Sequence, residues 1–115
     1  MRIVSPKALP PAPPHLSAAT KKFWAALVET YIFEPADLLR LTVACDAMDE
    51  IAACREAIKK DGRFVADRVG GVKSHPAIVA GRDARQLLLR SLRELSIDVE
   101  LPAEARISRQ SRRYG

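Results

Sequence analysis

The feature that most constrains this chain is one helical segment of unusual length, which begins at a proline and ends before a glycine. Pro35 suits the first helical position, and Gly62 suits the residue after a helix C-terminus. The helix is therefore predicted over 35–61. At 1.5 Å per residue it would be about 40 Å long, whereas a globular helix usually has about 11–12 residues.

A helix of this length needs neighbours on more than one side. Its apolar residues form a seam with the alternating 3-4 spacing of a coiled coil. A second stripe recurs at steps of seven, at Leu38, Cys45 and Ala52. A preceding helix can cover one flank, and a following helix or another subunit must cover the rest. The candidate oligomer contacts are the seam residues and one leucine that lies among later arginines: Leu41, Ala44, Met48, Ile51, Arg55, Ile58 and Leu89.

Arg55 is the unusual member of this seam, because an apolar core disfavours an unpaired charge. It would mark the edge of the seam or form a salt bridge to another chain.

A shorter helix is predicted before the long one, over about 17–31. Ser17 can cap it by accepting a hydrogen bond from an early backbone N–H. Its apolar residues around Trp24 recur at intervals of three and four, which is typical of a helix face that packs against a core. This aromatic stripe is predicted to be core rather than a surface for stacking nucleic-acid bases.

Residues 62–74 interrupt the helical pattern. They contain β-permissive residues, and Gly70-Gly71 is a plausible turn. A short β-hairpin or ordered loop is predicted here. The chain then enters a third helix over about 75–95, where Pro76 fits the first turn and Ser74 or His75 can act as the cap.

The predicted fold class is mainly α: a helical hairpin with one long central helix, a short β-hairpin or loop insertion, then a third helix, and flexible termini. A proline-rich extended arm is expected over 1–16, a helical core domain over 17–98 and a basic flexible tail over 99–115. The residues expected to have structural roles are Ser17, Trp24, Gly62, Gly70, Gly71, His75 and Pro76.

Positive charge is concentrated at the two ends of the chain. The net charge is +5, from 19 basic and 14 acidic residues. Residues 1–16 and 105–115 hold six of the basic residues and none of the acidic ones, so the body between them is nearly neutral. Basic arms of this kind often bind polyanions, although they can also serve only solubility.

The sequence shows no constellation that catalysis or metal binding would require. The pair Gly70-Gly71 lacks the Lys-Ser/Thr that follows in a phosphate-binding loop. His15, Cys45, Cys54 and His75 are scattered rather than set at metal-ligand spacing. Both cysteines lie in an apolar helical pattern, which predicts buried, reduced thiols of a cytosolic protein.

We therefore expect no enzymatic activity, no metal and no cofactor. His75 has no convergent partner in the sequence, so a structural role is expected for it. Asp46, Asp49 and Glu50 are interpreted as the ordinary polar face of a helix. No run of about 18 apolar residues predicts a membrane span, and the proline-broken N-terminus does not resemble a secretory signal.

The order of these features along the chain resembles that of a known protein family. "APPHLSAATKKFWAAL" precedes a long helix that opens "EPADLLRLTVACDAMDE", and "KKDGRF…GGVKSHPAI" precedes "ARQLLLRSLRELSI" and "LPAEARIS". Over about residues 12–108 this resembles the small subunit of phage terminase, of the P27 or HK97 type. The chain departs from some other small terminases in having no visible helix-turn-helix unit, which leaves the DNA-contacting surface open.

The resemblance implies a role in packaging viral DNA in the cytoplasm of a host bacterium, with no membrane contact. Its partners would be double-stranded DNA, further copies in a ring, and the large terminase subunit with its ATPase and nuclease. The alternatives are a helical adaptor that binds only protein and a small DNA-binding regulator. The candidate DNA-binding residues are Lys21, Lys22, Arg82, Arg85, Arg90, Arg93, Arg106, Arg109, Arg112 and Arg113.

Overall fold

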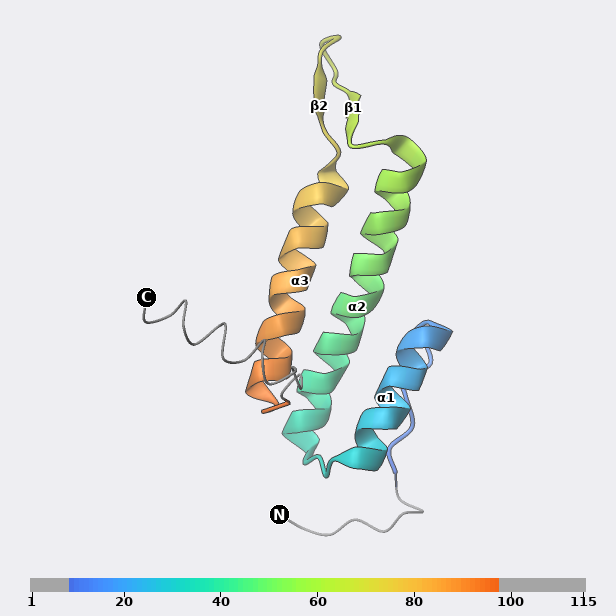
Figure 1. Cartoon of the computed structure of the whole chain (residues 1–115), viewed down its shortest axis with the longest axis vertical. Coiled ribbons are helices and arrows are strands. Elements are labelled where there is room, and N and C mark those ends of the chain that lie inside the picture. The colour runs from blue at the N-terminus through green and yellow to red at the C-terminus, as the bar shows by residue number, and fades with distance from the viewer. Residues whose placement is uncertain (1–8, 98–115) are drawn as a thin grey trace, which may run out of the picture.

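The computed structural model describes residues 9–97 of the 115-residue chain. Its elements are α1 (Ala18–Thr30), α2 (Pro35–Asp61), β1 (Phe64–Ala66), β2 (Val72–Ser74) and α3 (Pro76–Glu94). The helices α2 and α3 form an antiparallel hairpin, and α1 lies beside the N-terminal half of α2 (Figure 1). The two strands extend beyond the helices at the far end. The predicted fold class is thus confirmed.

The ends of α2 lie where the sequence predicts them. Pro35 occupies its first turn, and Gly62 follows it with a φ of +84°. The N–H of Gly62 donates to the carbonyl of Ile58 at 2.7 Å. Glycine is suited to this position because a side chain is strained at a positive φ.

The main core forms where α1, the preceding residues and α2 meet. Leu16, Trp24, Val28, Leu41 and Cys45 are buried together there. The indole Nε1 of Trp24 donates to the carbonyl of Pro10 at 3.0 Å. Residues 9–16, predicted as part of an extended arm, contain neither helix nor strand, yet they are held against α1. Residues 1–8 and the predicted tail over 99–115 lie outside the described residues.

The row of α2 residues that faces α3 differs from the predicted seam. Ala44, Ala47 and Cys54 are buried, and Ile51 and Ile58 between and beyond them are half-buried. A Cβ atom placed on Gly81 of α3 would lie only 3.3 Å from the Cβ of Cys54, so the two helices approach closely at this glycine. This difference between the observed row and the predicted seam explains why an arginine occurs in the predicted seam.

Arg55 is exposed because it lies beside the buried row and not in it. Leu41 and Ala44, two of the candidate oligomer contacts, are both 0% exposed within the single chain. They therefore provide no surface for a second subunit, since α1 and α3 already cover this side of α2. The oligomer contacts stay a prediction for the remaining members, Met48, Ile51, Arg55, Ile58 and Leu89.

The β-hairpin turns one residue earlier than its two glycines suggest. The strands pair antiparallel, with Ala66 opposite Val72 as the last pair before the turn. Asp67 accepts from the N–H of Gly70 at 3.4 Å, and its carboxylate accepts from the N–H of Val69 at 2.7 Å. Gly70 has a φ of +88°, as expected for the residue that closes a three-residue hairpin turn.

Of the two residues that could cap α3, Ser74 and His75, the structure shows that His75 does so. Its Nδ1 accepts from the N–H of Ala77 at 3.0 Å. Its Nε2, which then carries the proton, lies 3.0 Å from Oδ2 of Asp61 at the end of α2. The imidazole thus joins the two long helices below the β-hairpin.

Replacing His75 by alanine is expected to lower the free energy of unfolding by about 1–2 kcal/mol, because a helix loses its cap. His75→Asn can still cap the helix but cannot reach Asp61 in the same way, so its loss should be smaller. Urea unfolding followed by circular dichroism measures both variants. Equal losses for the two variants would show that the cap contributes no stability.

Candidate nucleic-acid interface

The positive charge of the described residues is gathered at the β-hairpin end of the molecule. Residues 55–85 hold eight basic side chains and four acidic ones. The remaining described residues, 9–54 and 86–97, hold five basic side chains and seven acidic ones. The body of the chain is nearly neutral as a whole, but its middle stretch is basic, and the fold places that stretch at the β-hairpin end.

Five of these basic residues form what we call the hairpin cluster. They come from the last turn of α2, the residue before β1, the turn and β2, and all are exposed: Lys59, Lys60, Arg63, Arg68 and Lys73. Within residues 9–97 none of the five forms an ion pair. The two acidic residues of the stretch are already engaged, Asp61 with His75 and Asp67 with the turn backbone.

Apolar side chains lie among the hairpin cluster. Phe64 is 66% exposed, Val72 is 72% exposed and Val69, at the turn, is 88% exposed. Phe64 and Val72 share one face of the ribbon, because residues two apart and their cross-strand partners point the same way. A projecting two-stranded ribbon of this kind is narrow enough for a major groove. Its cations suit phosphate oxygens, and its apolar tip suits sugars and base edges.

The predicted DNA-binding arginines of α3 are exposed, but they do not form one patch. Arg82 and Arg85 lie in the half of α3 nearer to the β-hairpin. Arg90 and Arg93 lie in the other half, where Glu94 adds an opposite charge. The structure brings none of them into an ion pair within the described residues.

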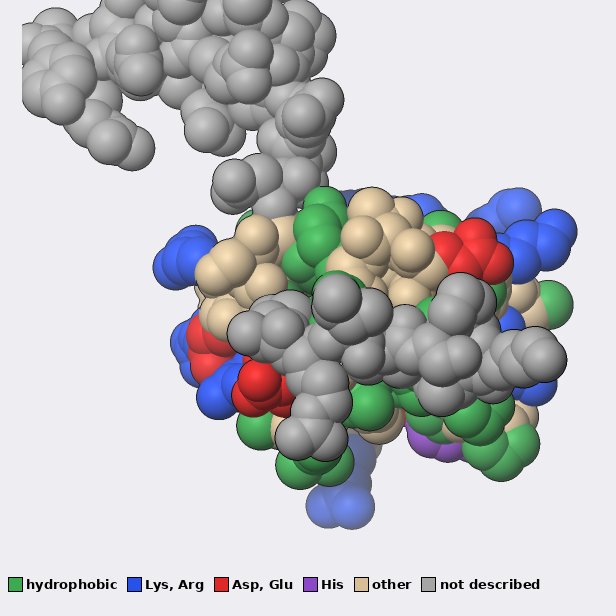
Figure 2. Space-filling view, turned by 90° about the horizontal axis from the view of Figure 1, so that it is seen from below, with side chains coloured by type: hydrophobic (Ala, Val, Ile, Leu, Met, Phe, Trp, Pro, Cys, Tyr) green, Lys and Arg blue, Asp and Glu red, His purple; other side chains and the backbone are tan. Residues whose placement is uncertain are grey.

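The other predicted DNA-binding residues are placed elsewhere. Lys21 and Lys22 are exposed on α1, beside the half of α2 that is far from the β-hairpin (Figure 1). Figure 2 views the molecule from that end, where basic side chains lie around the margin with acidic ones beside several of them. The tail residues Arg106, Arg109, Arg112 and Arg113 lie outside the described residues.

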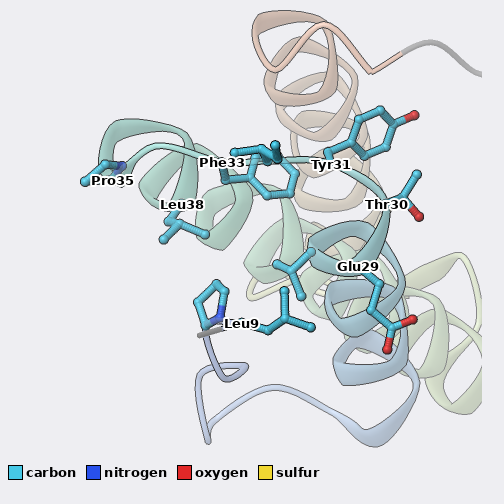
Figure 3. A pocket seen from close by; sticks show the side chains of 10 residues that line it. Leu9, Glu29, Thr30, Tyr31, Phe33, Pro35 and Leu38 are labelled. Atoms are coloured by element: carbon cyan, nitrogen blue, oxygen red, sulfur yellow. The ribbon is translucent and has the colours of Figure 1, made fainter. Parts of the chain in front are cut away.

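A second surface feature is an apolar pocket at the junction of α1 and α2 (Figure 3). Its volume is about 510 Å³, and Glu29 is the only charged residue that lines it. Tyr31 and Phe33 form a tilted aromatic pair there, with ring centroids 6.2 Å apart. Tyr31 and the neighbouring Ile32 are about 40% exposed. The pocket is suited to apolar contacts and presents no paired acid and base for catalysis.

Two carboxylates that we interpreted as an ordinary polar face have a structural role. Asp49 of α2 accepts from the backbone N–H of Ser17 at 2.9 Å and from the hydroxyls of Ser17 and Thr20 at 2.7 Å each. Asp46 lies 2.6 Å from Nε2 of His15. The bond from the Thr20 hydroxyl is the main cause that lowers the pKa of Asp49, with Ser17 adding to it.

The cysteines are buried thiols, as the apolar pattern predicts. Burial is the main cause that raises the pKa of Cys45 to about 11 and also raises the pKa of Cys54. Both are free of disulfides. Across the residues that the structure describes, no three His, Cys, Asp or Glu side chains are grouped to hold a metal ion.

Comparison with known proteins places the chain in a family. No curated protein and no solved structure matches it. Each helix within residues 9–97 is too short or too polar to span a lipid bilayer. A family model described as phage terminase, small subunit, matches residues 18–111, which is most of the chain. The match includes all three helices and the β-hairpin. The chain therefore belongs to the phage terminase small-subunit family.

Proposed function

We propose that this protein binds double-stranded DNA, assembles into a ring and regulates the large terminase subunit during phage genome packaging, without catalysing a reaction itself. Family membership supports a role in packaging by a phage-encoded protein that acts in the host cytoplasm. The observation that carries the DNA-binding part is the hairpin cluster, whose five cations are exposed and have no ion-pair partner within the described residues.

The proposed contact is made mainly with phosphates. Each lysine or arginine that neutralises a phosphate releases condensed counterions, which favours binding irrespective of base sequence. Sequence preference would be weak, since few side chains at the β-hairpin can read base edges. The tail arginines Arg106, Arg109, Arg112 and Arg113 are proposed to add further phosphate contacts. Lys21 and Lys22 lie on α1, away from the β-hairpin, and are proposed to contribute little to this contact.

The test replaces three members of the hairpin cluster together, as Arg63→Gln/Arg68→Gln/Lys73→Gln. The slope of log K against log salt for duplex DNA is expected to become shallower by about 2–3, because each lost phosphate contact removes about 0.9. Fluorescence anisotropy over a salt series measures this slope. The matched control is Lys21→Gln/Lys22→Gln, which is expected to leave the slope nearly unchanged.

An unchanged slope in the triple variant would remove the β-hairpin from the DNA contact. Circular dichroism of both variants checks that the helices are retained. The altered side chains are all exposed, so neither variant is expected to lose more than about 0.5 kcal/mol of stability.

The apolar pocket at the junction of α1 and α2 favours one second candidate, a helical adaptor that binds only protein. The pocket is at the end opposite to the hairpin cluster, and the large terminase subunit is the partner that the family suggests. In the first proposal both surfaces are used, one for DNA and the other for this subunit. A pull-down of the large subunit beside a DNA gel shift separates the two, since the adaptor captures the subunit but shifts no DNA.

A further inference from the structure

A groove runs between α2 and α3 on one side of the helical hairpin, and we call it the acidic groove. Small and apolar residues line it, with three carboxylates among them: Ala47, Ala80, Ala84, Leu87, Asp46, Glu50 and Asp83. Its volume is about 350 Å³. The apolar surface continues along α2, where Leu39 is 71% exposed and Val43 is 40% exposed. Ala80 is exposed on the groove, whereas Ala47 and Ala84 are buried beneath it, so small side chains separate the acidic ones.

The opposite side of the same two helices carries what we call the arginine patch, formed by Arg55, Arg82 and Arg85. Successive helical residues are about 100° apart, so Arg85 lies about 200° around α3 from both Asp83 and Leu87, and Arg82 lies about 100° from Asp83 and about 140° from Leu87. On α2, Arg55 lies about 140° from Glu50 and about 180° from Asp46 by the same measure. All three arginines are exposed, and none forms an ion pair within the described residues.

The acidic groove and the arginine patch lie at the same position along the helix axes. Arg82 and Arg85 lie on either side of Asp83 along α3, so the patch and the groove are level with each other. A second copy, rotated about an axis roughly parallel to the helices, would bring its arginine patch against the groove of the first. The same contact then repeats from copy to copy, and such a head-to-tail interface closes into a ring when the rotation closes.

The chemistry of the two surfaces is complementary. A guanidinium group binds carboxylates through paired hydrogen bonds, and its aliphatic stem packs on apolar surface. The exposed Ala80 lets such a stem approach, and Leu87, which is 40% exposed, would be covered by it. Within residues 9–97 the same arginines are exposed and form no ion pair.

We propose that a second copy of this chain inserts Arg82 and Arg85 into the acidic groove, where they pair with Glu50 and Asp83. This inference rests on the proposed ring and specifies the surfaces that form it. It assigns two of the predicted DNA-binding arginines to the contact between subunits. The hairpin cluster then remains free for DNA at one end of each subunit.

The test reverses the charge of each surface in the full-length protein. Arg82→Glu/Arg85→Glu makes the patch acidic, and Glu50→Lys/Asp83→Lys makes the groove basic. Each variant alone is expected to be monomeric at micromolar concentrations where the unaltered protein is oligomeric, as measured by sedimentation velocity. Mixing the two variants should restore assembly, because each patch then faces a groove of opposite charge. A single chain with all four substitutions should assemble as well.

Lys21→Glu/Lys22→Glu on α1 is the matched control and is expected to keep the oligomer. The combined four-fold variant also shows that the substitutions are compatible with folding. Assembly of either two-fold variant alone, or failure of both the mixture and the four-fold variant to assemble, would overturn this contact while leaving the proposed ring standing. A monomeric unaltered protein would overturn the ring and the contact together, whereas the salt slope of the hairpin cluster tests DNA binding separately.

Discussion

Replacing Trp24 by alanine is expected to lower the free energy of unfolding by about 3–5 kcal/mol, the usual range for an aromatic residue removed from a core. Trp24 is 4% exposed and lies in the cluster that joins α1 to α2. Its indole is also bonded to the carbonyl of Pro10, so the substitution releases the segment before α1. A domain of this size is stabilised by only about 5–15 kcal/mol, so the variant should be close to unfolding.

The measurement is urea unfolding followed by far-ultraviolet circular dichroism. Trp24→Phe keeps most of the aromatic volume but loses the indole N–H, so it should lose much less than the alanine variant. The missing hydrogen bond by itself is expected to account for about 1 kcal/mol. If the alanine variant lost less than 1 kcal/mol, α1 would not be packed against α2 through Trp24.

Replacing Asp49 by alanine is expected to lower the free energy of unfolding by about 2–3 kcal/mol at neutral pH. Its carboxylate accepts three hydrogen bonds from the N-terminus of α1, and each contributes roughly 1 kcal/mol net. Asp46→Ala is the matched control, since it removes one exposed contact to His15 that is worth about 0–1 kcal/mol.

The contribution of Asp49 should also depend on pH, because its pKa is lower in the folded protein than its ordinary value of 3.8. A carboxyl with a lowered folded pKa stabilises the protein fully above its unfolded pKa and loses that effect as the pH falls through the folded value. The unaltered protein should therefore lose this contribution below about pH 4. The difference in stability between Asp49→Ala and the unaltered protein should narrow over the same range. A difference in stability that stayed constant over this pH range would show that Asp49 does not stabilise the protein through its charge.

The helix ends could be predicted from the sequence because local chemistry determines them. Ser17, Pro35, Gly62 and His75 each act on backbone groups within a few residues of themselves. Proline has no amide hydrogen, glycine tolerates a positive φ and a cap satisfies an early N–H, whatever the rest of the chain does.

The packing of α2 could not be predicted from local chemistry in the sequence. Its apolar and small residues allow more than one seam, since alanine fits an exposed face almost as well as a close contact. The close approach at Gly81 sets the buried row through Ala47 and Cys54 and leaves Arg55 outside it. Leu41 then belongs to the core shared with α1, so it is unavailable to a neighbouring subunit.

The candidate site, too, has parts that the sequence could indicate and parts that it could not. The sequence could indicate the arginines of α3 because a helix places them by a regular rotation. The members of the hairpin cluster all lie within residues 59–73, but only the structure shows that all five are exposed and that none forms an ion pair within residues 9–97. Nor could the sequence show that Asp49 binds the start of α1, about 30 residues earlier in the chain.

By itself, then, the sequence determined which segments are helical, where they begin and end, and which family the chain resembles. These properties rest on interactions within a few residues or on the order of motifs. Only the tertiary structure decided which α2 residues are buried. It also showed that opposite sides of the α2 and α3 hairpin carry opposite charge. Such properties depend on residues far apart in the chain, whose positions are set by how whole helices pack.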